Sequence, residues 1–260
     1  MSTLDSAVHL PFLAQGDSEA VPVVLLHGLS DSWRSFEPLL PHLHSVRAIA
    51  VTQRGHGDAP KPDDGYEVAT LAADVAGVLD DAGVDRAVVV GHSMGSIVAT
   101  RMAIDHPERV SGLVLMGAKP TFDVPDLQEF LASAEMFEDP VDPAFMREFQ
   151  ESTVARVPVD GIIDTAVRES AKVPARVWRA LAAGALRADH AGVLGHIAAP
   201  TLLAYGDRDE FVTREDQETL LRGIPDARLR VYEGAGHAMH WEDPGEFARD
   251  LLAFVQQRVD

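Results

Sequence analysis

Short apolar runs alternate with segments of helical periodicity along most of the chain. Six runs rich in Val, Leu and Ile lie at residues 21–26, 46–51, 86–91, 110–117, 201–206 and 227–233. Their apolar residues are consecutive rather than alternating, which is typical of parallel strands buried on both faces. Apolar side chains spaced three and four apart predict helices over residues 69–83, 96–106 and 244–259. This order predicts an α/β fold with a mostly parallel central sheet flanked by helices.

The alternation is interrupted once, between about residues 120 and 195. Four segments of helical spacing follow one another there, each bounded by Pro or Gly, and none resembles the strand runs. Such a length exceeds what a loop in a compact domain normally spans. We therefore expect an α/β core of residues 1–119 and 196–260 with an inserted helical cap, or lid, over residues 120–195. Ahead of the first run, only residues 8–14 could add another strand.

Composition narrows the possible partners. The chain has 41 acidic and 22 basic residues, a net charge of −19, which repels nucleic acid and anionic membranes. Cysteine is absent, which excludes disulfides, thiolate nucleophiles and cysteine-bound metals. There is no basic start followed by an apolar run, and no stretch approaches the roughly 18 apolar residues of a membrane span. We expect a cytoplasmic protein whose oligomeric state the sequence does not indicate.

A motif for nucleophilic chemistry follows the run at 86–91. Residues 91–95 read Gly-His-Ser-Met-Gly, a G-x-S-x-G pattern between a predicted strand and a predicted helix. The sharp turn strains the backbone of the serine, and the flanking glycines leave room for it. Ser93 would then project above the sheet as a nucleophile, the alternative being a Gly-rich turn with an ordinary serine. His92 points elsewhere in such a turn and is expected to pack.

A serine nucleophile needs a base, which we expect on a loop after the last strand. The segment EGAGHAMH, residues 233–240, follows the last apolar run. Its two glycines let the loop fold back over the sheet edge, which favours His237 over His240 as the base. His240 is expected to pack beside Trp241 or to border the substrate. Because no spaced carboxylates accompany the pair, neither a metal nor another cofactor is expected.

A carboxylate that orients the imidazole completes this group. The segment YGDRDEFV, residues 205–212, offers Asp207, Asp209 and Glu210 directly after a predicted strand. Asp207 lies so close to the strand end that we expect it to serve the turn, whereas a loop could aim Asp209 at the histidine. After the preceding strand the first carboxylate is Asp123, and the lack of an earlier one favours Asp209.

The oxyanion of acyl transfer needs hydrogen-bond donors. In LLHGLSDSW, residues 25–33, a predicted strand leads into His-Gly and a helix start. Small Gly28 lets the backbone approach the serine and the substrate, so that the Leu29 N–H can face the oxyanion. The second expected donor is the Met94 N–H, at the start of the helix after the serine. Backbone donors tolerate any side chain, so these two assignments rest on position. His27 is expected to pack.

Taken together, these motifs resemble the α/β-hydrolase superfamily, in the order of its esterase, lactonase and haloperoxidase-like branches: HG at 27–28, RGHG at 54–57, GHSMG at 91–95, GDRD at 206–209 and GAGH at 234–237. The resemblance covers essentially the whole core. It implies Ser93 as nucleophile, Asp209 as acid and His237 as base. It also excludes the dehalogenase and epoxide hydrolase branches, which carry an aspartate at the position of Ser93. Thr52 and Ala59 replace residues that in this family usually tie down a turn.

The combined expectation is a serine hydrolase that cleaves a carboxylic ester or lactone through an acyl-enzyme. The alternatives are a C–C bond hydrolase acting on a diketone, a haloperoxidase-like perhydrolase, and a small-molecule receptor on the same fold. The substrate is expected to be a small hydrophobic molecule, because the insertion offers apolar side chains for a pocket: Phe122, Leu131, Met136, Phe137, Phe149, Trp178 and Leu181. Packing is the alternative for each, and Trp178 is the first that we expect to meet a ligand.

Overall fold

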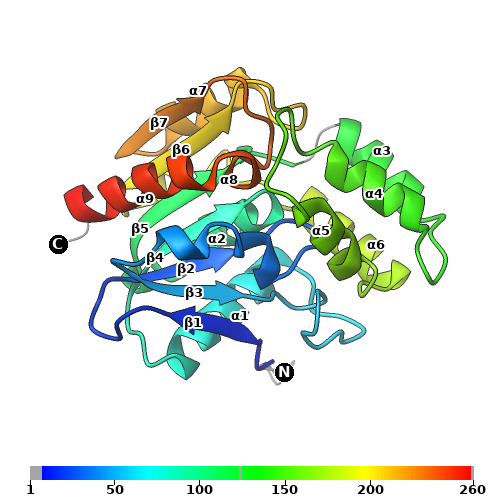
Figure 1. Cartoon of the computed structure of the whole chain (residues 1–260), viewed down its shortest axis with the longest axis horizontal. Helices are drawn as coiled ribbons and strands as arrows, with labels where there is room; N and C mark the ends of the chain where they lie inside the picture. Colours follow the sequence, from blue (N-terminus) through cyan, green and yellow to red (C-terminus); the bar gives the residue numbers. More distant parts are fainter. Residues whose placement is uncertain (1–7, 123–124, 259–260) are drawn as a thin grey trace.

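The computed structural model describes residues 8–122 and 125–258, in which helices flank both faces of one seven-stranded sheet (Figure 1). The strands are β1 (Phe12–Gln15), β2 (Pro22–Leu26), β3 (Arg47–Val51), β4 (Ala87–His92), β5 (Val110–Met116), β6 (Thr201–Gly206) and β7 (Ala227–Tyr232). The core helices are α1 (Val68–Asp81), α2 (Met94–Asp105), α7 (Arg214–Gly223), α8 (Met239–Glu242) and α9 (Pro244–Arg258). Short 3-10 turns are η1 (Trp33–Phe36), η2 (Leu40–His42), η3 (Pro107–Arg109) and η4 (Leu194–His196). The predicted α/β fold is confirmed.

The sheet has the order β1-β3-β2-β4-β5-β6-β7. Strands β2 to β7 run parallel, and only β1 pairs antiparallel, with Phe12 opposite Val51. All residues of β4 and β6 are buried, which explains why their sequences are apolar without alternation. Because the parallel strands point the same way, the loops that follow them meet at one edge of the sheet, where α/β proteins bind ligands.

Strand β1 is shorter than the sequence predicts. The expectation placed a strand over residues 8–14, but pairing with β3 begins only at Phe12. Pro11 has no N–H to donate, and its carbonyl instead accepts the Thr52 N–H at 2.9 Å. The strand therefore starts after the proline and covers four residues.

Alternate residues of the strands point into two separate cores. In β2, Val24 and Leu26 pack on one face, which α1, α2 and α7 cover. Val23 and Leu25 pack on the other, which α9, η1 and η2 cover. Apolar side chains are therefore needed at every strand position, because each face of the sheet carries its own layer of helices.

The RGHG motif has a structural role. Arg54 is almost fully buried and donates from Nε and Nη2 to the two carboxylate oxygens of Asp74 on α1, at 2.7 and 2.8 Å. Such a bidentate pair fixes both distance and orientation. The His56 Nδ1–H donates to the Arg54 carbonyl, and the His56 ring packs edge-on against His27. The loop after β3 is thereby held against both α1 and the loop after β2.

Four helices lie between β5 and β6: α3 (Pro125–Ala134), α4 (Pro143–Glu151), α5 (Ile162–Ser170) and α6 (Ala175–Leu186). We call residues 120–195 the helical insertion. Its two ends lie side by side, since the His190 N–H donates to the Pro120 carbonyl and Thr121 bridges Asp189. In Figure 1 the four helices form a group of their own beside the sheet.

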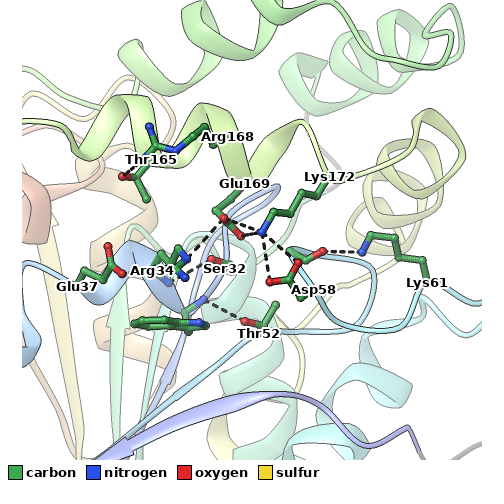
Figure 2. A network of polar contacts seen from close by, with 12 residues as sticks. Ser32, Arg34, Glu37, Thr52, Asp58, Lys61, Thr165, Arg168, Glu169 and Lys172 are labelled. Atoms are coloured by element: carbon green, nitrogen blue, oxygen red, sulfur yellow. Dashed lines mark hydrogen bonds and ion pairs between the residues drawn. The ribbon is translucent and has the colours of Figure 1, made fainter.

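Charged side chains join the helical insertion to the core (Figure 2). Glu169 of α5 is nearly buried, and its carboxylate lies 3.0 Å from the Lys172 Nζ and 3.7 Å from the Arg34 Nε. The same Lys172 Nζ lies 3.1 Å from Oδ1 of Asp58, on the loop after β3. One buried carboxylate thus connects α5 with the segments that follow β2 and β3. Within the described part of the chain, no helix is long and apolar enough to cross a membrane.

Candidate active site

Ser93 lies at the tight turn between β4 and α2. Its φ of 52° and ψ of −119° are strained for a residue with a side chain. The Ser93 N–H donates to the Met116 carbonyl at 2.9 Å, which ties the turn to β5. A Cβ on Gly91 would overlap the Gly95 carbonyl, and a Cβ on Gly95 would overlap the Leu26 carbonyl of β2. Both glycines of the motif are therefore required for chain segments to approach this closely.

His237 and Asp209 form a buried pair. The His237 Nδ1 lies 2.7 Å from Oδ2 of Asp209, and both side chains are almost fully buried. The other oxygen, Oδ1, accepts the backbone N–H groups of Phe211 at 2.7 Å and Val212 at 3.1 Å. A carboxylate only accepts, so this contact puts the ring proton on Nδ1 and leaves Nε2 as the basic nitrogen.

The neighbouring carboxylates have different positions. Asp207 Oδ1 accepts the Gly234 N–H at 2.6 Å, so it ties together the turns that follow β6 and β7. It therefore serves the turn, as its place at the end of the strand suggested. The alternative acid Asp123 lies outside the described residues.

Ser93 and His237 border a common cavity of about 330 Å³. Gly28, Leu29 and Met94 border it as well, and Asp209 stands behind His237. The structure therefore brings together all the residues predicted for the reaction. A Cβ on Gly117 would lie 2.5 Å from Cε1 of His237, so the imidazole occupies space that only glycine leaves open. The remaining wall is mainly apolar: Ile97, Phe122, Leu127, Phe130, Phe149, Leu181, Ala182, Ala185, Phe211, Val212 and Trp241.

The two backbone N–H groups expected to hold the oxyanion, those of Leu29 and Met94, belong to residues that border the cavity. Met94 is the first residue of α2, so its N–H has no acceptor within the helix. No acceptor for the Leu29 N–H occurs among the described residues. The peptide that carries this N–H is held by His27, whose Nδ1–H donates to the Gly28 carbonyl at 2.8 Å while its Nε2 accepts the Gln53 N–H. Burial lowers the pKa of His27, which keeps the ring neutral in this role.

Several residues predicted to border the pocket do not. Met136 is 81% exposed. Trp178 is fully buried behind the cavity wall, where it packs edge-on against Phe145 and Phe149. The expectation that Met136 and Trp178 border the cavity is therefore wrong, and the same holds for Leu131 and Phe137. Trp178 supports the wall from behind because the face of α6 that carries it packs against α4. The spacing of apolar residues in α6 does not specify which neighbouring helix that face meets.

His240 is likewise absent from the cavity wall, which corrects the expectation that it borders the substrate. It is fully buried, with its ring centre 4.7 Å from that of His92 and its Nε2 3.3 Å from the Ser35 Oγ. Burial lowers the pKa of His240 to about 3 and that of His92 well below its ordinary value. Both rings stay neutral and pack, as the sequence also suggested. Among residues 8–122 and 125–258, no three His, Asp or Glu side chains are arranged to hold a metal.

The sequence did not predict three buried polar residues of the wall, Asp31, Gln150 and Thr153. Asp31 lies in residues 25–33, which we call the oxyanion segment because it carries the expected donor Leu29. Its position three residues after Gly28 is a signal that could have identified it. Gln150 lies on α4, 119 positions away, and nothing local in its sequence marks it. The aromatic residues Phe130 and Phe211 also border the cavity without having been singled out.

Comparison with known proteins is consistent with this geometry. A model of the alpha/beta hydrolase family matches residues 23–250. The chain is 31% identical to a non-heme chloroperoxidase of Streptomyces lividans, over 93% of this chain and 94% of the relative.

Two solved structures are also similar. The esterase EaEST from Exiguobacterium antarcticum has a TM-score of 0.86 and 25% identity, over 95% of this chain and 96% of its own. Est816, described as an N-acyl homoserine lactone degrading enzyme, has a TM-score of 0.81 and 28% identity, over 95% and 97%. Similar chains thus act on more than one kind of substrate.

Proposed function

Because this chain belongs to the alpha/beta hydrolase family, we propose that it is a serine hydrolase that cleaves a carboxylic ester or lactone of a small hydrophobic molecule. The observation that carries the proposal is the 2.7 Å contact between His237 and Asp209 beside a cavity that the strained Ser93 also borders. Nucleophile, base and orienting acid are the three groups that this chemistry requires.

In the proposed reaction, the Ser93 Oγ attacks the substrate carbonyl carbon as its proton passes to the His237 Nε2. The negative charge that forms on the carbonyl oxygen is stabilised by the N–H groups of Leu29 and Met94. Asp209 holds the imidazole in the required tautomer and stabilises its protonated form. The tetrahedral intermediate collapses, the C–O bond to the leaving alcohol breaks, and His237 returns the proton to that alcohol.

Deacylation uses the same groups. Water loses a proton to His237 and attacks the acyl carbon, and the bond to the Ser93 Oγ breaks as the serine regains a proton. The products are a carboxylic acid and an alcohol, or one hydroxy acid when the substrate is a lactone. Apart from the substrate and one water, this reaction sequence uses only the chain's own side chains and backbone.

The cavity supports a small apolar substrate. Its volume of about 330 Å³ lies at the lower end of small-molecule sites. Leu127, Phe130, Phe149 and Leu181 of the helical insertion face Ile97 and Phe211 of the core across it. We propose that the insertion is a cap domain that selects the substrate, because it supplies much of the apolar wall. The similarity to an esterase and to a lactone-degrading enzyme supports the ester or lactone class.

A perhydrolase is the second candidate, favoured by the similarity to a non-heme chloroperoxidase. In that reaction hydrogen peroxide, rather than water, would attack the acyl-enzyme and release a peracid. The same active-site groups would serve, so the two candidates differ only in the second nucleophile.

The test is a panel of p-nitrophenyl esters and γ- and δ-lactones, assayed with the purified protein and with Ser93→Ala as the control. We expect turnover by the wild type, loss of turnover in the control, and a burst of p-nitrophenol that matches the enzyme concentration. Adding hydrogen peroxide with a peracid indicator separates the perhydrolase. Binding of panel members without turnover would instead favour a receptor and overturn the proposal.

A further inference from the structure

The apolar cavity has one buried polar corner away from Ser93 and His237. Of the other polar residues at its wall, Lys119 and Glu210 are at least partly open to solvent, and Thr153 donates its hydroxyl to the Gln150 carbonyl. His92 donates from Nε2 to the His237 carbonyl, and its Nδ1, which has no partner among the described residues, lies beside Gly28 and Ser93. Asp31 and Gln150 remain, 3% and 1% exposed, and the proposed reaction uses neither side chain.

Gln150 holds this corner together from the helical insertion. Its Nε2 lies 3.1 Å from the Ser30 Oγ, 3.3 Å from Oδ1 of Asp31 and 3.0 Å from the Ser170 Oγ. These contacts fix the amide plane between the oxyanion segment and α5. They use only the nitrogen of the amide. The Gln150 Oε1 has no partner among the described residues, and Gln150 borders the cavity.

The Gln150 Oε1 is not one of the fully enclosed side-chain atoms that lack a partner, so it is accessible at the cavity wall. A ligand hydroxyl or N–H can therefore donate to it. The nearby Asp31 carboxyl adds two further oxygens, which receive contacts from Gln150 and, at 3.4 Å, from the Ser35 hydroxyl. No Lys or Arg pairs with Asp31 in the described part of the chain. Burial raises its pKa well above the ordinary value, which favours an uncharged corner.

From these contacts we propose that Gln150 and Asp31 form a subsite that binds a neutral hydrogen-bond donor of the substrate, a hydroxyl or an amide N–H. The inference rests on the proposed function and narrows it: the substrate is an apolar ester or lactone that carries one such group at a distance from the reacting carbonyl. A site built around a hydrogen bond discriminates strongly against an analogue that lacks the donor, because its buried polar groups are then left unpaired.

The test compares p-nitrophenyl esters of matched size that differ in one group. Each ω-hydroxy acyl ester, 6-hydroxyhexanoate and its longer homologues, is paired with the alkanoate in which a methyl group replaces the hydroxyl. We expect wild-type kcat/KM to favour the hydroxy ester by about tenfold or more at one chain length. In Gln150→Met, which keeps the side-chain size, the ratio should fall to about one. The ratio is unaffected by any general loss of activity.

A matched control is Gln217→Met. Gln217 is also fully buried and donates to a backbone carbonyl, that of Ala118, but it does not border the cavity. Its replacement should leave the substrate ratio at the wild-type value. Equal rates for every ester pair in the wild type would overturn the subsite while leaving the proposed function intact. Preference for an ω-ammonium ester over the hydroxy ester would also overturn it, since the subsite would then bind a cation.

Absence of ester turnover would count against the proposed function, and binding then tests the subsite separately. Methyl 6-hydroxyhexanoate and methyl heptanoate are titrated calorimetrically into Ser93→Ala and into the same variant carrying Gln150→Met. Tighter binding of the hydroxy ester to the first protein, lost in the second, supports the subsite. Equal binding of the two esters to the first protein contradicts it.

Discussion

The Nδ1 of His237 lies 2.7 Å from the Oδ2 of Asp209, whereas Asp207, two residues earlier, is bonded to the N–H of Gly234. Two carboxylates on one loop therefore have separate tasks. Oδ1 of Asp209 is itself held by two backbone N–H groups, so the carboxylate cannot rotate away from the imidazole without breaking them.

This relationship predicts unequal effects of two matched substitutions. Asp209→Asn should lower kcat by about 10⁴-fold, because an amide that donates to Nδ1 favours the wrong imidazole tautomer. Asp207→Asn should lower kcat far less and act mainly on stability, through the turn that it holds. Ester hydrolysis and urea unfolding of both variants provide the check. The opposite ranking of kcat would assign the acid to Asp207.

The strained backbone of Ser93 predicts that replacing this residue with glycine removes activity but increases stability. Ser93→Gly should abolish turnover yet raise the free energy of unfolding by about 1 kcal/mol, because glycine adopts a φ of 52° without the strain that a side chain imposes. Ser133→Gly, at an exposed position in the last turn of α3, should instead lower it by about 0.5 kcal/mol. Urea denaturation measures both. A loss of stability in Ser93→Gly as large as in the control would show that the turn stores no strain.

Substitution of the two histidines in the last loop should have different effects, on catalysis for His237 and on packing for His240. His237→Ala should reduce kcat about as much as loss of Ser93, since a nucleophile and its base act as a unit. His240→Ala should leave kcat within a modest factor but lower the free energy of unfolding by about 2–4 kcal/mol, because it empties a fully buried site between His92 and Phe36. Kinetics and denaturation on the same samples test this. A folded His240→Ala protein without activity would contradict the assignment.

The core of the fold could be read from the sequence because burial on both faces leaves a strong local signal. Strand β4 is apolar at every position before the G-x-S-x-G turn, and the structure places its ends within a residue or two of the prediction. The contact between Asp209 and His237 could also be predicted from the sequence, since both residues follow parallel strands that end at one edge of the sheet. Motif spacing sufficed there because the sheet dictates the geometry.

The pocket could not be predicted in the same way. The side of α6 that carries Trp178 and the position of Gln150 on α4 depend on how the insertion helices pack, and many arrangements share one helical periodicity. The contact between Gln150 and Asp31 joins residues 119 positions apart without any strand pairing to align them. Long-range contacts between helices leave little trace in local sequence.

The buried histidines predict acid sensitivity. Burial lowers the pKa of His56 to about 4, whereas a histidine in the unfolded chain takes up a proton below about pH 6.5. Between these values the unfolded chain binds more protons, so the free energy of unfolding should fall as the pH is lowered, by up to about 1.4 kcal/mol per pH unit for each such histidine. The raised pKa of Asp31 acts in the opposite direction.

A single variant measures the contribution of one histidine to this pH dependence of the free energy of unfolding. In His56→Gln, the loss of unfolding free energy from pH 6.5 to pH 5 should be smaller than in the wild type, by up to about 1.4 kcal/mol per pH unit. Urea titrations at several pH values give both slopes, and comparing slopes removes any constant cost of the substitution. Identical slopes would show that His56 takes up its proton equally in the folded and unfolded chains.

The last prediction concerns the attachment of α5 to the core (Figure 2). Glu169 lies nearly buried between Arg34 and Lys172, so Glu169→Gln should remove the charge that joins the two and let α5 separate from the core more often. We expect hydrogen exchange in peptides covering α5 to rise about tenfold, with no change in β4, and high salt to narrow the difference. Asp164→Asn removes a carboxylate on the same helix from an exposed pair with Arg147 and should leave exchange unchanged. If both substitutions speed exchange equally, helix α5 is loosened by any loss of charge, and the buried position of Glu169 has no special role in holding it.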